Sequence, residues 1–300
     1  MSAIDSITTL PTRTTQRGST PRSMGDILVA SGRLSPANLQ RILDSQAQNH
    51  SPFGETAIAL QLLTKDDIDQ ALSQQFDYAY LSEADHSLSP ELVAAYKPFS
   101  RTGENLRAVR SQVMLRWLNG DAARKALAVV SPGAAEGRSF VAANLAIVFA
   151  QQGQRTLLID ADLRAQPDRA QHALFKLTRS AGLSGVLAER ATLAEAAQAV
   201  PSLPGLVVLP AGAVPPNPQE LLGRPRFEEL LHTAASQFDV ILIDTPSGSA
   251  YADAEIIAAR AGAAILVARQ NTTLVPAASA LAERLQSSGV ALIGSVLNDA

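Results

Sequence analysis

From residue 126 onward, short apolar runs alternate with longer segments in which apolar residues recur at helical spacing. Runs that are apolar at consecutive positions are typical of strands buried on both faces, and their alternation with helices predicts a parallel sheet covered on both sides. The fold class expected for residues 126–300 is therefore α/β. The predicted strands are residues 126–130, 156–159, 206–209, 240–243, 264–267 and 291–297.

The first part of the chain contains an internal duplication. Aligning the chain with itself at an offset of 29 residues pairs Leu34-Ser35 with Leu63-Thr64, and each Ser or Thr stands at the N-cap position of a predicted helix. Neither half can bury its own apolar face, so residues 23–90 are expected to pack as one small, mainly helical domain. The other matching pairs are Met24-Gly25 with Phe53-Gly54, Leu39 with Ile68, Leu43 with Leu72, and Gln46 with Gln75.

Two further segments complete the predicted organisation. Residues 1–22 are rich in Ser, Thr and Arg and lack an apolar core, so they are expected to form a flexible tail. Residues 91–125 are predicted to form a linker and a helix, on which Glu104, Arg107 and Arg110 lie along one face at a spacing of three. From the residues alone, this face suits a solvated helix with an internal ion pair.

Composition excludes several classes of function. A net charge of −3 and a pI of about 5.8 leave no broad basic surface for nucleic acid. The absence of cysteine excludes disulfides, thiolate metal sites and thiol nucleophiles, and suits a reducing compartment. The longest apolar stretches are too short to span a bilayer. A cytoplasmic protein is expected, with any membrane association supplied by a partner.

The segment after the first predicted strand has the layout of a phosphate-binding loop. A turn containing Gly133 and Gly137 joins the strand to a helix, so backbone N–H groups and the helix dipole would point at an anion such as phosphate. The strict pattern G-x-x-x-x-G-K-[ST] is broken twice. Pro132 replaces the first glycine and Arg138 replaces the lysine, whereas Ser139 is kept.

Carboxylates follow two other predicted strands. Asp160 and Asp162 end the second strand, and Asp244 ends the fourth, as in a Walker B motif. In open α/β sheets, ligands collect beyond the carboxyl ends of the strands, where these side chains and Ser139 would meet. Hard oxygen ligands beside phosphates favour Mg²⁺. Each Asp taken singly could instead cap a helix, but three beside the loop indicate a nucleotide site.

Together, these segments resemble the bacterial tyrosine kinases, in the branch that determines exopolysaccharide chain length. The resemblance covers about residues 99–298. It implies a P-loop kinase that transfers a phosphoryl group from Mg-ATP to tyrosine. Its motifs are Glu136-Gly137-Arg138-Ser139, Asp160-Ala161-Asp162-Leu163-Arg164, Pro216-Asn217-Pro218-Gln219-Glu220-Leu221-Leu222 and Glu104-x-x-Arg107-x-x-Arg110.

The same resemblance implies a role for each site residue. Arg138 would contact the β- and γ-phosphates, and Asp160 would accept the proton of a tyrosine hydroxyl. Asp162 completes the implied catalytic set with Arg138 and Asp160. The implied Mg²⁺ ligands are Ser139, Asp162 and Asp244. The implied ATP-binding residues are Gly133, Ala135, Glu136, Gly137, Arg138, Ser139, Phe140 and Asn298, of which Asn298 would touch the adenine.

Family partners follow from the resemblance as well. A membrane polysaccharide co-polymerase or chain-length adaptor would complete or activate the nucleotide site. Glu104, Arg107 and Arg110 match the motif that mediates ring-like self-association, so a homo-oligomer is expected. The family often has a tyrosine-rich tail, whereas the sequence ends at Ala300 without one, and tail autophosphorylation is not expected.

Two other functions stay open. Because Arg and Lys are not interchangeable at a phosphate site, Arg138 and Pro132 favour a catalytically weak nucleotide switch or docking protein as the alternative to a kinase. A positioning ATPase of the MinD and ParA type ranks third, because no lysine lies between Ser131 and Arg138.

The duplicated domain resembles the N-terminal domain of type II secretion and pilus-assembly ATPases, some of which bind cyclic di-GMP. The motif glycines correspond to Gly25 with Gly32 in the first copy, and to Gly54 in the second, where Gln61 replaces the later glycine. The motif arginine is missing from both copies. Protein docking is therefore the preferred role of this domain, and cyclic di-GMP is the alternative ligand.

Overall fold

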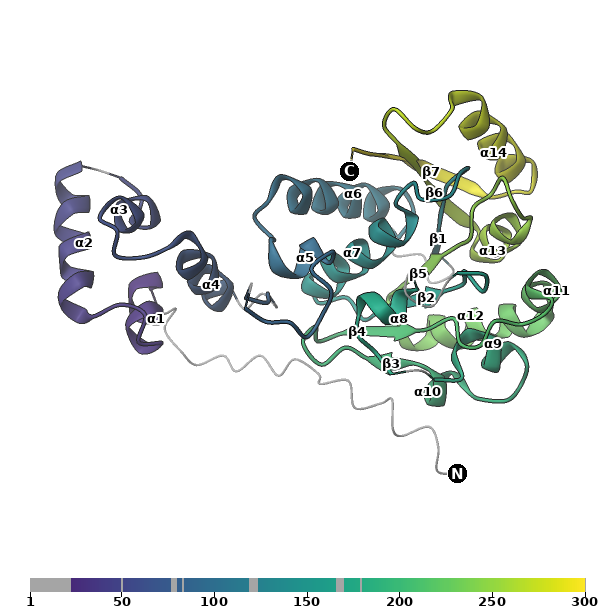
Figure 1. Cartoon of the computed structure of the whole chain (residues 1–300), viewed down its shortest axis with the longest axis horizontal. Coiled ribbons are helices and arrows are strands. Elements are labelled where there is room, and N and C mark those ends of the chain that lie inside the picture. The colour runs from purple at the N-terminus through teal and green to yellow at the C-terminus, as the bar shows by residue number, and fades with distance from the viewer. Residues whose placement is uncertain are drawn as a thin grey trace. The chain divides into compact units, whose positions relative to one another are not determined.

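The computed structural model describes residues 23–49, 51–76, 80–82, 84–118, 124–165, 170–178 and 180–299 (Figure 1). The predicted tail at residues 1–22 lies outside these ranges. The chain divides into two compact units, with the boundary between Asp85 and His86. Each unit has a hydrophobic core of its own.

The described part of the N-terminal unit contains four helices. These are α1 (Met24–Ala30), α2 (Pro36–Asn49), α3 (Phe53–Ala59) and α4 (Lys65–Phe76). The predicted caps are present: the hydroxyl of Ser35 accepts from the Asn38 N–H at 3.2 Å, and that of Thr64 accepts from the Asp67 N–H at 3.2 Å. The buried core consists of Ile27, Leu28, Leu34, Ile42, Ala57, Leu63, Ile68 and Ala71.

The duplication reappears in the backbone of this unit. Gly32 and Gln61, which are 29 residues apart, both adopt left-handed conformations, with φ of 72° and 55°. Helix α1 packs against α4, and α2 packs against α3, so each copy covers the apolar face of the other. The mainly helical, duplicated domain expected from the sequence is confirmed.

The second unit contains a sheet of seven strands in the order β3-β4-β2-β5-β1-β6-β7. All neighbouring strands are parallel except β3, which pairs antiparallel with β4 at the edge. The α/β class is confirmed; the two-residue strand β3 was not predicted. The strands are β1 (Ala126–Val130), β2 (Thr156–Asp160), β3 (Gln198–Ala199), β4 (Leu206–Leu209), β5 (Val240–Asp244), β6 (Ala263–Arg269) and β7 (Ala291–Asn298).

Helices cover both faces of the sheet (Figure 1). Alternate strand residues such as Ile241 and Ile243 pack with α12 (Pro225–Gln237), α13 (Asp253–Ala261) and α14 (Val275–Ser287). Helix α7 (Arg138–Gln151) contacts β1, β2 and β5, but its residues are not part of that cluster. It therefore packs on the opposite face, as strands buried on both sides require. Shorter helices are α8 (Gln171–Leu174), α9 (Gly182–Leu187), α10 (Leu193–Ala196) and α11 (Pro218–Gly223).

The predicted helical stretch that begins at residue 91 is two helices, α5 (Val93–Tyr96) and α6 (Arg101–Arg116). Pro98 separates them, because the residue before a proline is pushed out of the helical region. Ser100 then caps α6 by accepting from the Gly103 N–H at 3.1 Å. Both helices pack against α7, so this segment belongs to the sheet unit. Within the described ranges, no helix has the length and apolar character needed to cross a membrane.

Candidate nucleotide and metal site

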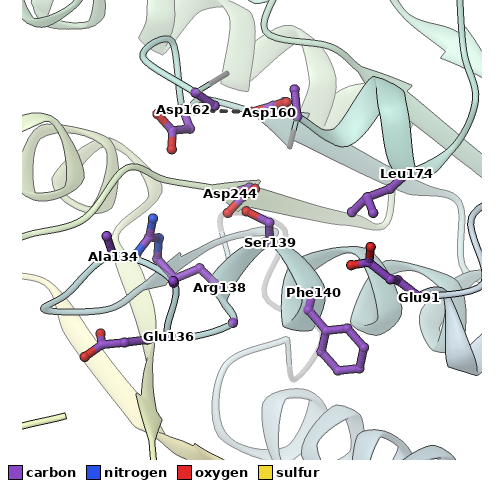
Figure 2. A pocket seen from close by; sticks show the side chains of 14 residues that line it. Glu91, Ala134, Glu136, Arg138, Ser139, Phe140, Asp160, Asp162, Leu174 and Asp244 are labelled. Atoms are coloured by element: carbon purple, nitrogen blue, oxygen red, sulfur yellow. Dashed lines mark hydrogen bonds between the residues drawn. The ribbon is translucent and has the colours of Figure 1, made fainter. Parts of the chain in front are cut away.

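The loop between β1 and α7 forms one wall of a cavity of about 610 Å³ (Figure 2). Gly137 directly precedes α7 and has a φ of 97°, and Ala135 is also left-handed, with a φ of 56°. A Cβ atom at position 137 would collide with the Asn298 side chain, so both backbone conformation and space require glycine there. No side chain caps the N-terminus of α7, which leaves its first N–H groups for an anion.

Arg138 lines this cavity but is buried beneath the loop. Its Nε donates to the Thr245 carbonyl at 2.8 Å, and its Nη1 donates to the Ser131 hydroxyl at 2.5 Å and the Gly133 carbonyl at 2.7 Å. These bonds tie the loop to the end of β5. Arg138 thus supports the loop in addition to supplying positive charge to the cavity.

Asp160 and Asp244 face each other because β2 and β5 are neighbours that pair these two residues in register. Both side chains are buried. Burial is the main cause that raises the pKa of Asp160 well above its usual value, and the nearby Asp244 charge raises it further. Burial also raises the pKa of Asp244, against the lowering effect of Arg138 and of hydrogen bonds from Gln171 and Ser139.

Asp162 lies on the rim of the same cavity. Burial raises the pKa of its carboxyl, and the Arg164 N–H, which donates to its Oδ1 at 3.2 Å, opposes that effect. Asp160 is more constrained. Its Oδ1 accepts from the Asp162 N–H at 3.3 Å and its Oδ2 accepts from the Gln171 N–H at 2.8 Å. A backbone scaffold therefore fixes the orientation of the buried carboxyl.

The donor set fits a magnesium ion that is shared with phosphate. The Oδ1 atom of Asp244 is buried and has no hydrogen-bond partner among the described residues. Figure 2 shows the Ser139 hydroxyl beside the Asp244 carboxylate, and its hydrogen-bonding effect lowers the pKa of Asp244. Within the described part of the chain, no three acidic or His side chains form a metal cluster. Ser139, Asp162 and Asp244 would hold the ion, and phosphate and water oxygens would supply its other ligands.

The structure brings most of the predicted site residues together. The cavity lining contains Ala135, Glu136, Gly137, Arg138, Ser139, Phe140, Asp160, Asp162 and Asp244. Gly133 and Asn298 are not part of the lining. Asn298 ends β7 and its Nδ2 donates to the Glu136 carbonyl at 3.2 Å, so it contacts the loop.

The Glu136 carboxylate is buried and has protein partners. Its Oε2 accepts from the Gly133 N–H at 2.6 Å, and its Oε1 accepts from the Thr273 hydroxyl at 2.5 Å. Arg269 donates to the Ala135 carbonyl at 3.2 Å. The connection between β6 and α14 therefore holds the phosphate loop from outside.

Sequence reasoning missed several residues of this region. Gln171 contacts Asp160 and Asp244, but it comes from a short helix with no recognisable pattern. Asp253 is buried and pairs with Arg164 at 2.7 Å, and the Arg164 guanidinium lies 3.9 Å from the centre of the Tyr251 ring. The Asp-x-Asp-x-Arg spacing was a signal for Arg164. Further lining residues are Glu91, Ala134, Ala165, Ala170 and Leu174.

Several known proteins are similar to this chain in sequence and in fold. A family model described as cellulose biosynthesis protein BcsQ matches residues 125–288. Tyrosine-protein kinase YwqD of Bacillus subtilis is 36% identical over 207 residues, which cover 69% of this chain and 85% of that protein. The chain belongs to the bacterial tyrosine-kinase family. Its sheet unit has the P-loop NTPase fold, which it shares with the cell division ATPase MinD of Pyrococcus furiosus (26% identical, TM-score 0.50 over 58% of this chain and 71% of that one).

Other kinases of the family are longer or are known as isolated domains. Tyrosine-protein kinase wzc of Salmonella typhimurium is 34% identical over 208 residues, but the chain spans only 28% of its length. The structure of the kinase domain of Escherichia coli tyrosine kinase ETK is 32% identical, with a TM-score of 0.66 over 73% of this chain and 83% of that one. The BcsQ family model begins after the helical unit, so it does not cover the duplicated domain.

Proposed function

We propose that this chain is an ATP-dependent protein tyrosine kinase that regulates exopolysaccharide synthesis, export and chain length. The observation that carries the proposal is the buried Asp244 Oδ1, which lies beside Ser139 and has no donor among the described residues, near the uncapped N-terminus of α7. A buried carboxylate oxygen without a donor is expected to meet a ligand or an ion. Mg-ATP supplies both the ion and the anion that this arrangement suits.

The loop N–H groups and the first turn of α7 would bind the phosphates, with Arg138 providing positive charge. A cavity of about 610 Å³ is within the usual range for small-molecule sites. Ser139, Asp162 and Asp244 would hold Mg²⁺, which neutralises charge on the transferring phosphates. Asn298, which contacts the loop through the Glu136 carbonyl, is the proposed adenine contact.

In the transfer step, a tyrosine Oη forms a bond to the γ-phosphorus while the bond from that phosphorus to ADP breaks. Asp160 accepts the hydroxyl proton, and ADP leaves. Burial and the neighbouring Asp244 charge raise the pKa of Asp160, which makes its ionised carboxylate a stronger proton acceptor. Its two backbone hydrogen bonds, one to each oxygen, hold the carboxyl in one orientation.

The biological setting proposed for the kinase comes from its family. The chain would act in the cytoplasm, recruited to the membrane by a polysaccharide co-polymerase or chain-length adaptor. Copies would associate through Glu104, Arg107 and Arg110. The duplicated helical unit would dock a protein, with cyclic di-GMP as the alternative ligand, which isothermal titration of that nucleotide tests directly.

The arrangement of Arg138 supports a second candidate function. Because its guanidinium is tied to Thr245, Ser131 and Gly133, it has less freedom to follow a moving γ-phosphate than a lysine has. The alternative is therefore a catalytically weak nucleotide switch that controls the co-polymerase. Such a protein would bind Mg-ATP with little phosphoryl transfer.

One experiment separates the two functions. The purified chain is incubated with its membrane adaptor and γ-labelled ATP, and phosphotyrosine is measured in wild type, Asp160→Asn and Asp162→Asn. A kinase gives phosphotyrosine in the wild type that falls by about 10²-fold or more in Asp160→Asn, the usual contribution of a general base. ATP binding with no phosphotyrosine under any condition would leave the switch as the function.

A further inference from the structure

Gln171 is the first residue of α8, and its side chain is fully buried. It belongs to none of the motifs that identify the nucleotide site. A buried amide with no apolar role is costly unless its donors and acceptor are used. The contacts of Gln171 therefore indicate what it does.

One residue connects three parts of the site. The Gln171 backbone N–H donates to Asp160 Oδ2 at 2.8 Å, at the end of β2. Its side-chain Nε2 donates to Asp244 Oδ2 at 2.7 Å, at the end of β5, and to the Ser139 carbonyl at 3.1 Å, in the first turn of α7. A carbonyl and a carboxylate both accept, so the NH₂ group must be the end that faces them. The orientation of the amide is thereby determined.

Two buried acceptors remain without a donor in the described structure, namely Gln171 Oε1 and Asp244 Oδ1. Gln171 donates a hydrogen bond to Oδ2 of the Asp244 carboxylate, so Oδ1 remains available to another partner. Buried acceptors of this kind are normally satisfied, so water or a ligand is expected to supply the missing partner. Gln171 thus sets which oxygen of Asp244 is available to an ion.

We propose that Gln171 is a positioning residue for Mg²⁺ in the nucleotide site. It orients the Asp244 carboxylate and holds it against Ser139, without contacting the reacting atoms. The inference rests on the proposed binding of Mg-ATP but is independent of phosphoryl transfer. Residues that orient metal ligands typically contribute 10- to 100-fold to metal affinity.

The test compares ATP affinity with and without Mg²⁺ by isothermal titration on the full chain. Gln171→Leu is expected to weaken ATP binding about 10- to 100-fold in the presence of Mg²⁺, and to leave binding in EDTA within about twofold. In the Asp244→Asn background, Gln171→Leu should cause no further loss, because the two changes remove one interaction. A general defect in folding would weaken both measurements equally.

Gln198→Leu is the matched control, since Gln198 lies in β3 and its side chain bonds to Thr178. Gln198→Leu should leave the ATP affinity unchanged both in Mg²⁺ and in EDTA. If Gln171→Leu does not fold, Gln171→Met, which keeps the shape of the side chain, is measured instead.

Unchanged Mg²⁺-dependent affinity, or an equal loss in EDTA, would overturn the inference. A wild type that binds no ATP would overturn the proposed function too, whereas Mg-ATP binding without phosphoryl transfer would overturn the kinase proposal alone.

Discussion

Arg138 both lines the cavity and braces the loop around it. Its charge faces the cavity, and its guanidinium ties Ser131 and Gly133 to the Thr245 carbonyl. The bulkier side chain at this position therefore acts partly as a structural brace. This explains how a loop with Pro132 in place of its first glycine still holds the left-handed residues that an anion site needs.

Two substitutions at Arg138 should separate the effect of its charge on ATP binding from its structural support of the loop. Arg138→Ala is expected to weaken ATP binding by about 100-fold or more, because it removes a charge-assisted contact and leaves buried loop carbonyls without a donor. Arg138→Lys should retain binding within about tenfold while lowering the melting temperature of the apo protein. Titration calorimetry and thermal unfolding of both variants measure these effects. Equal ATP affinity in Arg138→Ala and wild type would contradict a phosphate role.

The carboxyl pair predicts a pH dependence of stability. Burial raises the pKa of Asp244 in the folded state, so its contribution to stability is fully present below the unfolded pKa, near 3.8, and is lost as pH rises through the folded pKa. Asp244→Asn should therefore raise the free energy of unfolding at pH 7 and reduce its decline above pH 4. Urea unfolding between pH 4 and 8 measures this. The same variant should lose Mg²⁺-dependent ATP binding.

Asp239→Asn is the control, because its effect on the free energy of unfolding is expected to have the opposite sign. A hydrogen bond from Arg155 lowers the pKa of Asp239, so this group stabilises the fold above its unfolded pKa and loses that effect as pH falls. Its replacement should destabilise the protein at pH 7. If both variants changed the free energy of unfolding in the same direction, the conclusion that burial raises the pKa of Asp244 would be wrong.

At the scale of elements, the connection between β6 and α14 supports the phosphate loop. Thr273→Val removes the hydroxyl that donates to Glu136 Oε1, and should weaken ATP binding about five- to tenfold, in line with about 1 kcal/mol for such a bond. Thr273→Ser keeps the hydroxyl and should bind as wild type does. Fluorescent nucleotide titration of the pair tests this. Equal ATP affinity in Thr273→Val and Thr273→Ser would show that this hydroxyl does not support the phosphate loop.

Helix α6 carries the predicted self-association motif, and its three residues are not equivalent. The Arg110 guanidinium donates to the Val148 carbonyl at 2.9 Å, and that of Arg107 donates to the Pro98 carbonyl at 2.7 Å. Both arginines thus have roles within one chain. Glu104 is largely exposed and pairs with Arg107 at 2.6 Å. Glu104 is the residue through which self-association can be tested without disturbing the fold.

Charge reversal at this position should separate association from folding. Glu104→Arg is expected to shift the chain toward monomer in sedimentation velocity, with an unchanged melting temperature, because exposed ion pairs contribute little to stability. Arg110→Ala should lower the melting temperature instead, because it leaves a carbonyl of α7 without its donor. An oligomer that persists in Glu104→Arg would argue against this surface.

At the scale of the whole molecule, separate cores predict separable units. The buried clusters of the helical and sheet units share no residues. A chain that begins at His86 is expected to melt cooperatively and to bind Mg-ATP within about twofold of the full chain. Calorimetry and titration of both proteins test this. A large loss of affinity on removing residues 1–85 would show that the helical unit acts on the nucleotide site.

The amino-acid sequence determined the class of the fold and indicated which residues would gather at the site. Apolar runs buried on both faces require a covered parallel sheet, and the matching N-caps at Ser35 and Thr64 mark a duplicated helical unit. The alternation of strands and helices also implied that Asp160, Asp244 and the phosphate loop would meet, because parallel strands end at one edge of the sheet. These features depend on residues close together in the chain, or on topology alone.

Only the tertiary structure decided which atoms of these residues are free. The burial of Arg138 beneath its loop, the contact of Glu136 with Thr273 and the bridge from Gln171 to Asp244 join segments 70 or more positions apart. Such contacts depend on packing in three dimensions, which no local spacing encodes. The sequence thus indicated that the carboxylates and the phosphate loop would meet here, and the packing around them decided that Asp244 Oδ1 is the oxygen left without a donor among the described residues.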